Sequence, residues 1–253
     1  MVESLGGNYK FLADTQMKLI LFSYAAFLLN ILLASSPQVA APRQAPDNHA
    51  TAVPSAPSAQ QIWADLMEGN RRFVASAPKF HDLAGLRNGL TKAQHPKAIV
   101  LACSDSRVAP ELLFDQSLGD LFVIRTAGNI GDAIGVGSIE YAVEHLGSSV
   151  LVVLGHTKCG AVTAACSGEK MPSANLEAIV DKIGPAVAKT GCSGKSDEFI
   201  EATIKQNVHQ SGKDVLASSE LLRHFVEEGK LTVFEAEYQL DTGEVIRLDR
   251  DRH

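Results

Sequence analysis

Three short, almost uninterrupted apolar runs constrain the fold of this chain more than any other feature. They are rich in β-branched residues and occupy residues 98–102 (AIVLA), 121–124 (LFVI) and 150–154 (VLVVL). Strands that are buried on both faces have this composition, which is typical of parallel sheets covered by helices. Residues 132–146 lie between the last two runs and are long enough for a crossover helix. The sequence therefore predicts a βαβ unit.

Helical periodicity surrounds these runs, and a turn signal lies near the end of the chain. Helices are predicted over residues 60–76, 176–189, 197–210 and 214–228. Residues 231–240 and 244–248 flank Asp241-Thr242-Gly243, which indicates a β-hairpin. The predicted fold class is α/β: a single domain with a mainly parallel central sheet flanked by helices, plus an antiparallel late strand.

The first 59 residues differ in composition from the rest of the chain. Residues 19–34 are uncharged and follow Lys18, which is typical of an export signal with its apolar stretch of about 7 to 15 residues. Residues 35–59 hold five of the ten prolines together with much Ala and Ser, as a linker does. We therefore expect residues 1–34 to be an N-terminal extension with a signal peptide or anchor, and residues 60–253 to be the folded domain.

This N-terminal pattern leads to an expected location. The protein is expected to be exported, either to the periplasm or out of the cell. The alternative is a membrane anchor formed by residues 19–34, which are somewhat shorter than the about 20 apolar residues of a spanning helix. The cleavage site and the true start codon stay open.

The charge balance argues against large anionic partners. The formal net charge is -6 at pH 7, and the acidic excess lies after residue 57. Neither a nucleic-acid-binding surface nor a polybasic patch for anionic lipids is expected from such a balance. We therefore expect a small-molecule substrate, no nucleic acid, and membrane contact only through an uncleaved N-terminal segment.

Chemically useful side chains follow two of the apolar runs. The first run is followed by CSDSR at residues 103–107, and the third by GHTKCG at residues 155–160. Ligands collect at the carboxyl ends of the strands in open parallel sheets. If the extended backbone continues beyond the first run, Cys103, Asp105 and Arg107 lie on one face of the strand.

Three of these residues form a candidate metal site. His156 and Cys159 are three positions apart where a strand turns into a helix, and Cys103 follows a nearby strand. Two thiolates and one imidazole form a donor set that suits zinc. Structural zinc sites usually have four protein ligands, whereas three ligands leave one position open for catalysis. Each residue alone is more often an ordinary core residue, so the prediction rests on their occurrence together.

Two other interpretations of these motifs are weaker. The segment from Gly155 to Gly160 opens like a phosphate-binding loop, but Ala161-Val162 replace the required Lys and Ser or Thr. A Cys103 nucleophile with His156 as its base is a second option. That option leaves Cys159 without a role.

The motifs resemble those of the β-class carbonic anhydrases. The resemblance extends over about residues 60–250 and rests on CSDSR at 103–107, FVIRTAGN at 122–129 and GHTKCGA at 155–161. It implies an enzyme, a carbonate dehydratase, for the reversible hydration of carbon dioxide to bicarbonate and a proton. It also implies one Zn²⁺ per chain, held by Cys103, His156 and Cys159.

The resemblance implies roles for four further residues and for a second copy of the chain. Asp105 and Arg107 would form a catalytic dyad in which the guanidinium holds the carboxylate off the metal. Gln94 and the backbone N–H of Gly160 would bind the substrate. At least a homodimer is implied, with the helix at residues 60–76 as a candidate arm across the partner.

Other functions and one cysteine pairing stay open. The same site could hydrolyse another small linear substrate such as carbon disulfide, or the chain could be a non-catalytic zinc- or bicarbonate-binding protein with Cys166 as a fourth ligand. Cys166 and Cys192 could form a disulfide after export or remain buried thiols. The proton shuttle, the regulation by bicarbonate or pH, the physiological direction of the reaction and the oligomer beyond a dimer are also undetermined by the sequence.

Overall fold

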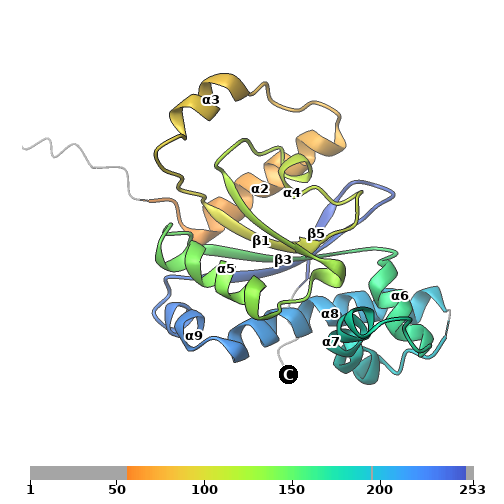
Figure 1. Ribbon diagram of the computed structural model, residues 1–253. Coiled ribbons are helices and arrows are strands. Elements are labelled where there is room, and N and C mark those ends of the chain that lie inside the picture. The colour runs from red at the N-terminus through yellow and green to blue at the C-terminus, as the bar shows by residue number, and fades with distance from the viewer. Residues whose placement is uncertain (1–55, 195, 249–253) are drawn as a thin grey trace, which may run out of the picture. The chain divides into compact units, whose positions relative to one another are not determined.

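A five-stranded sheet forms the centre of the computed structural model, which describes residues 56–194 and 196–248 (Figure 1). The strand order is β2-β1-β3-β4-β5. The strands are β1 (Ala98–Cys103), β2 (Leu121–Thr126), β3 (Val150–His156), β4 (Thr232–Tyr238) and β5 (Val245–Arg247). β1 to β4 pair in parallel and β5 pairs antiparallel to β4. The predicted α/β class with its antiparallel late strand is confirmed.

The predicted export segment lies outside the described residues, as does most of the predicted linker. None of the helices in the described part of the chain combines the length and the apolar character that crossing a membrane requires.

β1 and β3 are completely buried because helices cover both faces of the sheet. Val100 and Val152 belong to one apolar cluster, whereas Leu101 and Val153 belong to a second cluster on the opposite face. Successive side chains of a strand point to opposite faces. A strand that is covered on both faces therefore needs an apolar residue at nearly every position, which explains the uninterrupted runs in the sequence.

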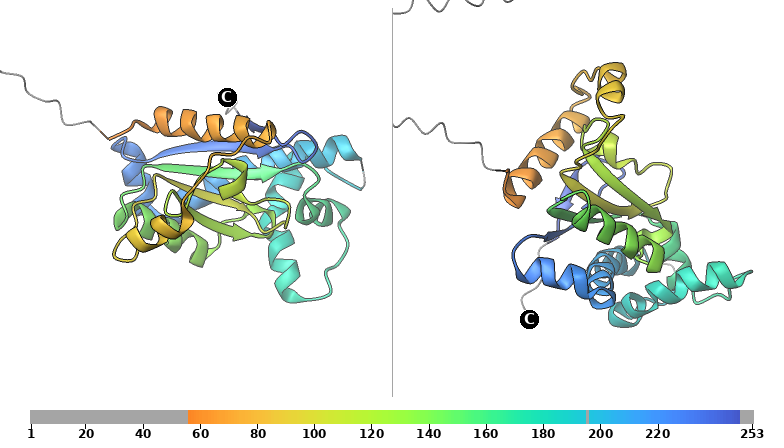
Figure 2. Two further views of the ribbon diagram at one scale, coloured as in Figure 1. Left: turned by 90° about the horizontal axis from the view of Figure 1, so that it is seen from above. Right: turned by 60° about the vertical axis from the view of Figure 1, so that its left-hand side comes forward.

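The helices form one layer on each face of the sheet (Figures 1 and 2). α2 (Ala59–Val74) and the short α4 (Pro110–Leu113) lie on one side, and α5 (Ala133–Glu144), α8 (Asp197–Ser218) and α9 (Glu220–Glu227) lie on the other. α3 (Leu83–Gly89) has no buried residue. α2 buries Ile62 and Leu66, and its Trp63 stacks on Phe234 of β4. It therefore covers the sheet of its own chain, and its role as an arm across a partner stays a prediction.

A third group of elements lies at the carboxyl ends of the parallel strands. It consists of the short 3₁₀ helix η1 (Ala127–Asn129), α6 (Gly160–Ser167) and α7 (Ala174–Thr190). Together with α8 these elements enclose a separate cluster of buried residues that includes Cys103, Cys159 and Ile183. This is the end of the sheet at which the sequence predicts the site.

The prediction of two helices over residues 197–228 is wrong about where the first one ends. α8 continues through residues 211–213 to Ser218. Gly212 has a packing role inside this helix. An added Cβ would lie 2.8 Å from Oε1 of Glu235, so the glycine lets α8 lie close to β4. The break falls instead at Ser219, whose Oγ accepts a hydrogen bond from the N–H of Leu222 and caps α9.

Cys166 and Cys192 form a disulfide, which answers the question that the sequence left open. Their Cα atoms are 5.4 Å apart, and both residues are buried. Cys166 lies in the last turn of α6 and Cys192 follows the end of α7. The bond therefore links the end of α6 to the residue that follows the C-cap of α7, and both cysteines belong to the buried cluster that contains Cys103 and Cys159.

Gly69 allows α2 to contact Phe114, the residue that follows α4. A Cβ at this position would lie 1.7 Å from the carbonyl oxygen of Phe114, a backbone atom that cannot move aside alone. We expect Gly69→Ala to lower the free energy of unfolding by at least about 2 kcal/mol in chemical denaturation. The matched control is Gly137→Ala in α5, where nothing lies within 4 Å. It should raise stability by about 0.5–1 kcal/mol, and equal effects of the two changes would contradict this account.

The disulfide restricts the unfolded chain over a sequence separation of 26 residues. The double variant Cys166→Ala, Cys192→Ala should therefore lose about 3–4 kcal/mol of unfolding free energy. Urea unfolding of this variant would measure the loss, and wild-type protein treated with a thiol reductant should approach the same curve. A variant that unfolds at the same urea concentration as the oxidised wild type would show that the pair contributes nothing.

Candidate metal centre

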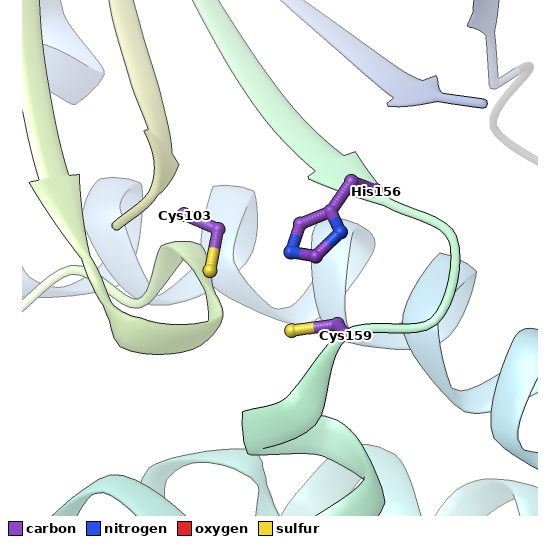
Figure 3. A group of neighbouring side chains, drawn as sticks. All are labelled: Cys103, His156 and Cys159. Carbon is purple, nitrogen blue, oxygen red and sulfur yellow. The ribbon is translucent and has the colours of Figure 1, made fainter. Parts of the chain in front are cut away.

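The parallel pairing of β1 and β3 brings the predicted ligands together. Cys103 is the last residue of β1 and His156 is the last residue of β3. Cys159 follows after a turn in which Lys158 has a φ of 56°, and it directly precedes α6. The ligand atoms of these three residues all lie within 4.8 Å of one another. Figure 3 shows both sulfur atoms and the imidazole ring directed toward a common point.

The geometry of His156 prepares one ring nitrogen for a ligand. Nδ1 lies 2.9 Å from the carbonyl oxygen of Thr157, so this hydrogen bond assigns the proton to Nδ1. Nε2 is buried and has no hydrogen-bond partner among the described residues. Buried polar atoms are nearly always paired. The unpaired Nε2 beside two sulfur atoms therefore fits a metal ligand, and the donor set of one imidazole and two thiols fits zinc.

The two thiols differ in how readily they ionise. The pKa of Cys103 is lowered, first because Cys159 donates a hydrogen bond to its sulfur, and further because the N–H of Gly128 stabilises the thiolate. The same pairing and burial raise the pKa of Cys159. Metal ligation requires both thiolates. Binding of a cation between them would therefore release the proton that Cys159 holds.

Asp105 and Arg107 form a bidentate ion pair next to the three ligands. Nε of Arg107 donates to Oδ1 at 2.9 Å, and Nη2 donates to Oδ2 at 2.8 Å. The Arg107 guanidinium holds the pKa of Asp105 well below its usual range, mainly through these hydrogen bonds. Oδ2 also lies 3.9 Å from Nε2 of His156. An ionised carboxylate of fixed orientation thus borders the point on which the three ligands converge.

The expectation that strand alternation places Cys103, Asp105 and Arg107 on one face is wrong. The extended backbone does not continue past Cys103, because β1 ends there and a turn at Ser106 and Arg107 follows. The N–H of Arg107 donates to Oδ1 of Asp105 at 2.9 Å, and the N–H of Val108 donates to the carbonyl oxygen of Asp105 at 3.0 Å. The turn, and not strand alternation, brings the carboxylate and the guanidinium together.

Three residues outside the predicted set support these loops. Nε and Nη2 of Arg125 donate to the carbonyl oxygens of Cys103 and Asp105 at 3.1 and 2.6 Å. The N–H of Gly128 donates to Sγ of Cys103 at 3.3 Å. Oε1 of Glu201 in α8 accepts from the N–H of Lys158 at 3.0 Å. Membership in the FVIRTAGN motif could have indicated the first two, but nothing in the sequence points to Glu201.

The two predicted substrate-binding residues occupy very different positions. Gly160 is the first residue of α6 and adjoins Cys159, so its N–H has no partner within the helix. Gln94 precedes β1, and nearby Pro96 accepts a hydrogen bond from Ser148 just before β3. Gln94 thus lies at the amino edge of the sheet, roughly 17–20 Å from the carboxyl edge by the length of β1. A single chain does not bring it to the site.

The disulfide also bears on the alternative of a closed, four-ligand site. That alternative uses the thiol of Cys166 as the fourth ligand. Cys166 is bonded to Cys192, so it has no free thiolate to offer. Among the residues that the structure describes, the only free cysteines are Cys103 and Cys159.

Known proteins are similar to this chain both in sequence and in fold. The family model described as "Carbonic anhydrase" matches residues 98–245. Carbonic anhydrase 2 of Mycobacterium tuberculosis is 40% identical over 194 residues, which cover 74% of this chain and 91% of the relative. A β-carbonic anhydrase structure from Coccomyxa has a TM-score of 0.60 at 26% identity, covering 73% of this chain and 85% of its own. A tetrameric β-carbonic anhydrase from Sordaria macrospora has a TM-score of 0.57 at 25% identity, covering 76% and 93%.

Proposed function

Because the chain belongs to the β-class carbonic anhydrase family, we propose that it catalyses the reversible, zinc-dependent hydration of carbon dioxide to bicarbonate and a proton. The observation that carries this proposal is the buried Nε2 of His156, which faces two thiol sulfurs and has no hydrogen-bond partner among the described residues. Cys103, His156 and Cys159 would hold one Zn²⁺ per chain. When bound, zinc supplies Lewis-acid activation that lowers the pKa of a water molecule from about 15.7 toward about 7.

Asp105 would orient the reacting water, and Arg107 would keep Asp105 in place. The carboxylate lies close enough to the three ligands to compete for the metal itself. Its bidentate pairing with Arg107 fixes both oxygens in a geometry that Lys cannot reproduce. Since its pKa is held low, Asp105 would accept a hydrogen bond near neutral pH without taking up the proton.

The substrate-binding roles divide between the chain and a second copy. The N–H of Gly160 adjoins Cys159 and would donate to an oxygen of carbon dioxide or bicarbonate. Gln94 would act only in the site of another subunit, because it lies at the opposite edge of its own sheet. The tetrameric state named for the Sordaria macrospora relatives supports a homo-oligomer.

We also infer that the protein works in an oxidising compartment after export. The disulfide between Cys166 and Cys192 supports this inference, because disulfides persist mainly in such compartments. The uncharged segment at residues 19–34 supports it independently. A periplasmic or secreted location follows from both, with anchoring by the same segment as the alternative.

Stopped-flow measurement of carbon dioxide hydration tests the proposed reaction directly. Purified protein should accelerate hydration, lose this activity on treatment with a zinc chelator and regain it when Zn²⁺ is restored. Metal analysis should find about one zinc per chain. Full activity after complete removal of the metal would contradict the mechanism. Turnover of carbon disulfide without hydration of carbon dioxide would favour the alternative substrate.

Substitution of Arg107 separates catalysis from metal binding. Arg107→Ala should retain zinc but lower kcat by about 100-fold or more, because Asp105 then loses its fixed orientation. Arg107→Lys should not restore activity, since one ammonium cannot replace the bidentate contact. Cys159→Ala should lose the metal. The control is Arg87→Ala in the exposed α3, which should behave as wild type, and an Arg107→Ala enzyme of equal kcat would rule out the dyad.

A further inference from the structure

A buried amide of α8 is connected to the metal centre through two hydrogen bonds. Asn207 is 1% exposed, and its Nδ2 donates to the carbonyl oxygen of Gly128 at 2.8 Å. The N–H of Gly128 in turn donates to Sγ of Cys103 at 3.3 Å. Asn207 and Gly128 are 79 positions apart in the chain. No sequence motif contains both residues.

The loop that carries Gly128 has an uncommon backbone conformation. Gly128 and Asn129 both have positive φ angles, 74° and 48°, a conformation that glycine and asparagine adopt more readily than other residues. A Cβ on Gly128 would lie 2.9 Å from Cδ1 of Ile183 and 3.2 Å from Cβ of Ala161. The turn is therefore confined by its neighbours. Asn207 supplies a directional contact that fixes the rotation of this peptide segment.

The Asn207 side chain is not explained by packing alone. Its Oδ1 is buried without a hydrogen-bond partner among the described residues. An unsatisfied buried oxygen costs free energy, and the adjacent Val208 and the preceding Ile204 of α8 are buried apolar residues. A polar residue at this cost is typical of functional positions. The one bond that it donates goes to the loop on Cys103.

A hydrogen bond to a thiolate changes what the sulfur can give to a metal. The N–H attracts electron density from the sulfur, so the thiolate becomes a weaker donor. Two thiolates cancel most of the charge of a divalent cation, which opposes activation of water. A correctly directed N–H on one sulfur offsets part of this effect.

We propose that Asn207 is a positioning residue, which fixes the Gly128 N–H on the sulfur of Cys103 and so limits the charge that this thiolate donates to the metal. The inference rests on the proposed function, because it assumes that Cys103 is a metal ligand. Asn207 itself contacts neither the metal ligands nor the substrate position through any hydrogen bond of the described structure.

Cobalt substitution measures the charge donation directly. In the Co²⁺-loaded protein, Asn207→Leu and Asn207→Ala should move the thiolate-to-cobalt charge-transfer band to longer wavelength, since the sulfur regains electron density. In the zinc enzyme, kcat should fall about 2- to 10-fold, the worth of one hydrogen bond. The alanine variant decides the question if the leucine variant does not fold.

The matched control is Thr203→Val, one turn earlier on α8. Thr203 is also fully buried, and its hydroxyl pairs with Thr190 and donates to Phe199 within the helical layer. The Thr203→Val control should lower the free energy of unfolding but leave the thiolate-to-cobalt charge-transfer band at its wild-type wavelength. An Asn207 variant with the wild-type band, or a control with the same shift, would overturn the proposal.

A measurement on the wild-type protein covers the case in which no Asn207 variant folds. With a spin-active cadmium isotope in the site and nitrogen-labelled glycine, the amide proton of Gly128 should show scalar coupling to the metal across the N–H···S bond. Gly137, exposed in α5, should show none. Absence of coupling at Gly128 would overturn the inference. Wild-type protein that binds no metal or hydrates no carbon dioxide would instead overturn the proposed function.

Discussion

The parallel pairing of β1 with β3 is the constraint on which the rest of the structure depends. Adjacent parallel strands end at the same edge of a sheet, so the last residues of both strands, Cys103 and His156, meet there without any further device. Parallel pairing also requires helices on both faces. These helices bury β1 and β3 completely. The same arrangement therefore positions the ligands and removes them from water.

Burial makes the support of the site as important as the ligands. In a poorly solvated setting, each ligand atom keeps its orientation only if its neighbours are also hydrogen-bonded. The site meets this requirement with contacts from two segments. Arg125 and Gly128 of the 122–129 stretch donate to the backbone of Cys103 and Asp105 and to the sulfur of Cys103, and the carbonyl oxygen of Thr157 bonds to His156. α8 then fixes two of the loops through Glu201 and Asn207. α8 thus contacts both the loop that carries Lys158 and the loop that carries Gly128.

The sequence predicts what depends on local pattern and leaves out what depends on tertiary contact. The apolar runs predict β1, β2 and β3, because a doubly covered strand has few alternatives in composition. The two cysteines and the histidine at or just after the strand ends predict the ligand set, because two thiolates and one imidazole suit zinc. The turn after Cys103 was missed because its hydrogen bonds involve the Asp105 side chain, which strand alternation ignores. Asn207 and Glu201 were missed because their partners lie far away in the chain. The end of α8 was misplaced because Gly212 looks like a helix end in the sequence, whereas in the fold it allows close packing of α8 against Glu235 of β4.

The four cysteines of the chain fall into two pairs with opposite chemical requirements, and α6 keeps the pairs apart. Cys103 and Cys159 must remain thiols to bind a metal, whereas Cys166 and Cys192 are joined as a disulfide. Cys159 precedes the first turn of α6 and Cys166 lies in its last turn, about 10 Å further along the helix axis. This separation along the helix axis keeps the Cys159 thiol away from the disulfide. The disulfide joins the last turn of α6 to the residue that follows the C-cap of α7. A disulfide and a pair of free thiols that could hold a metal therefore lie at opposite ends of one helix.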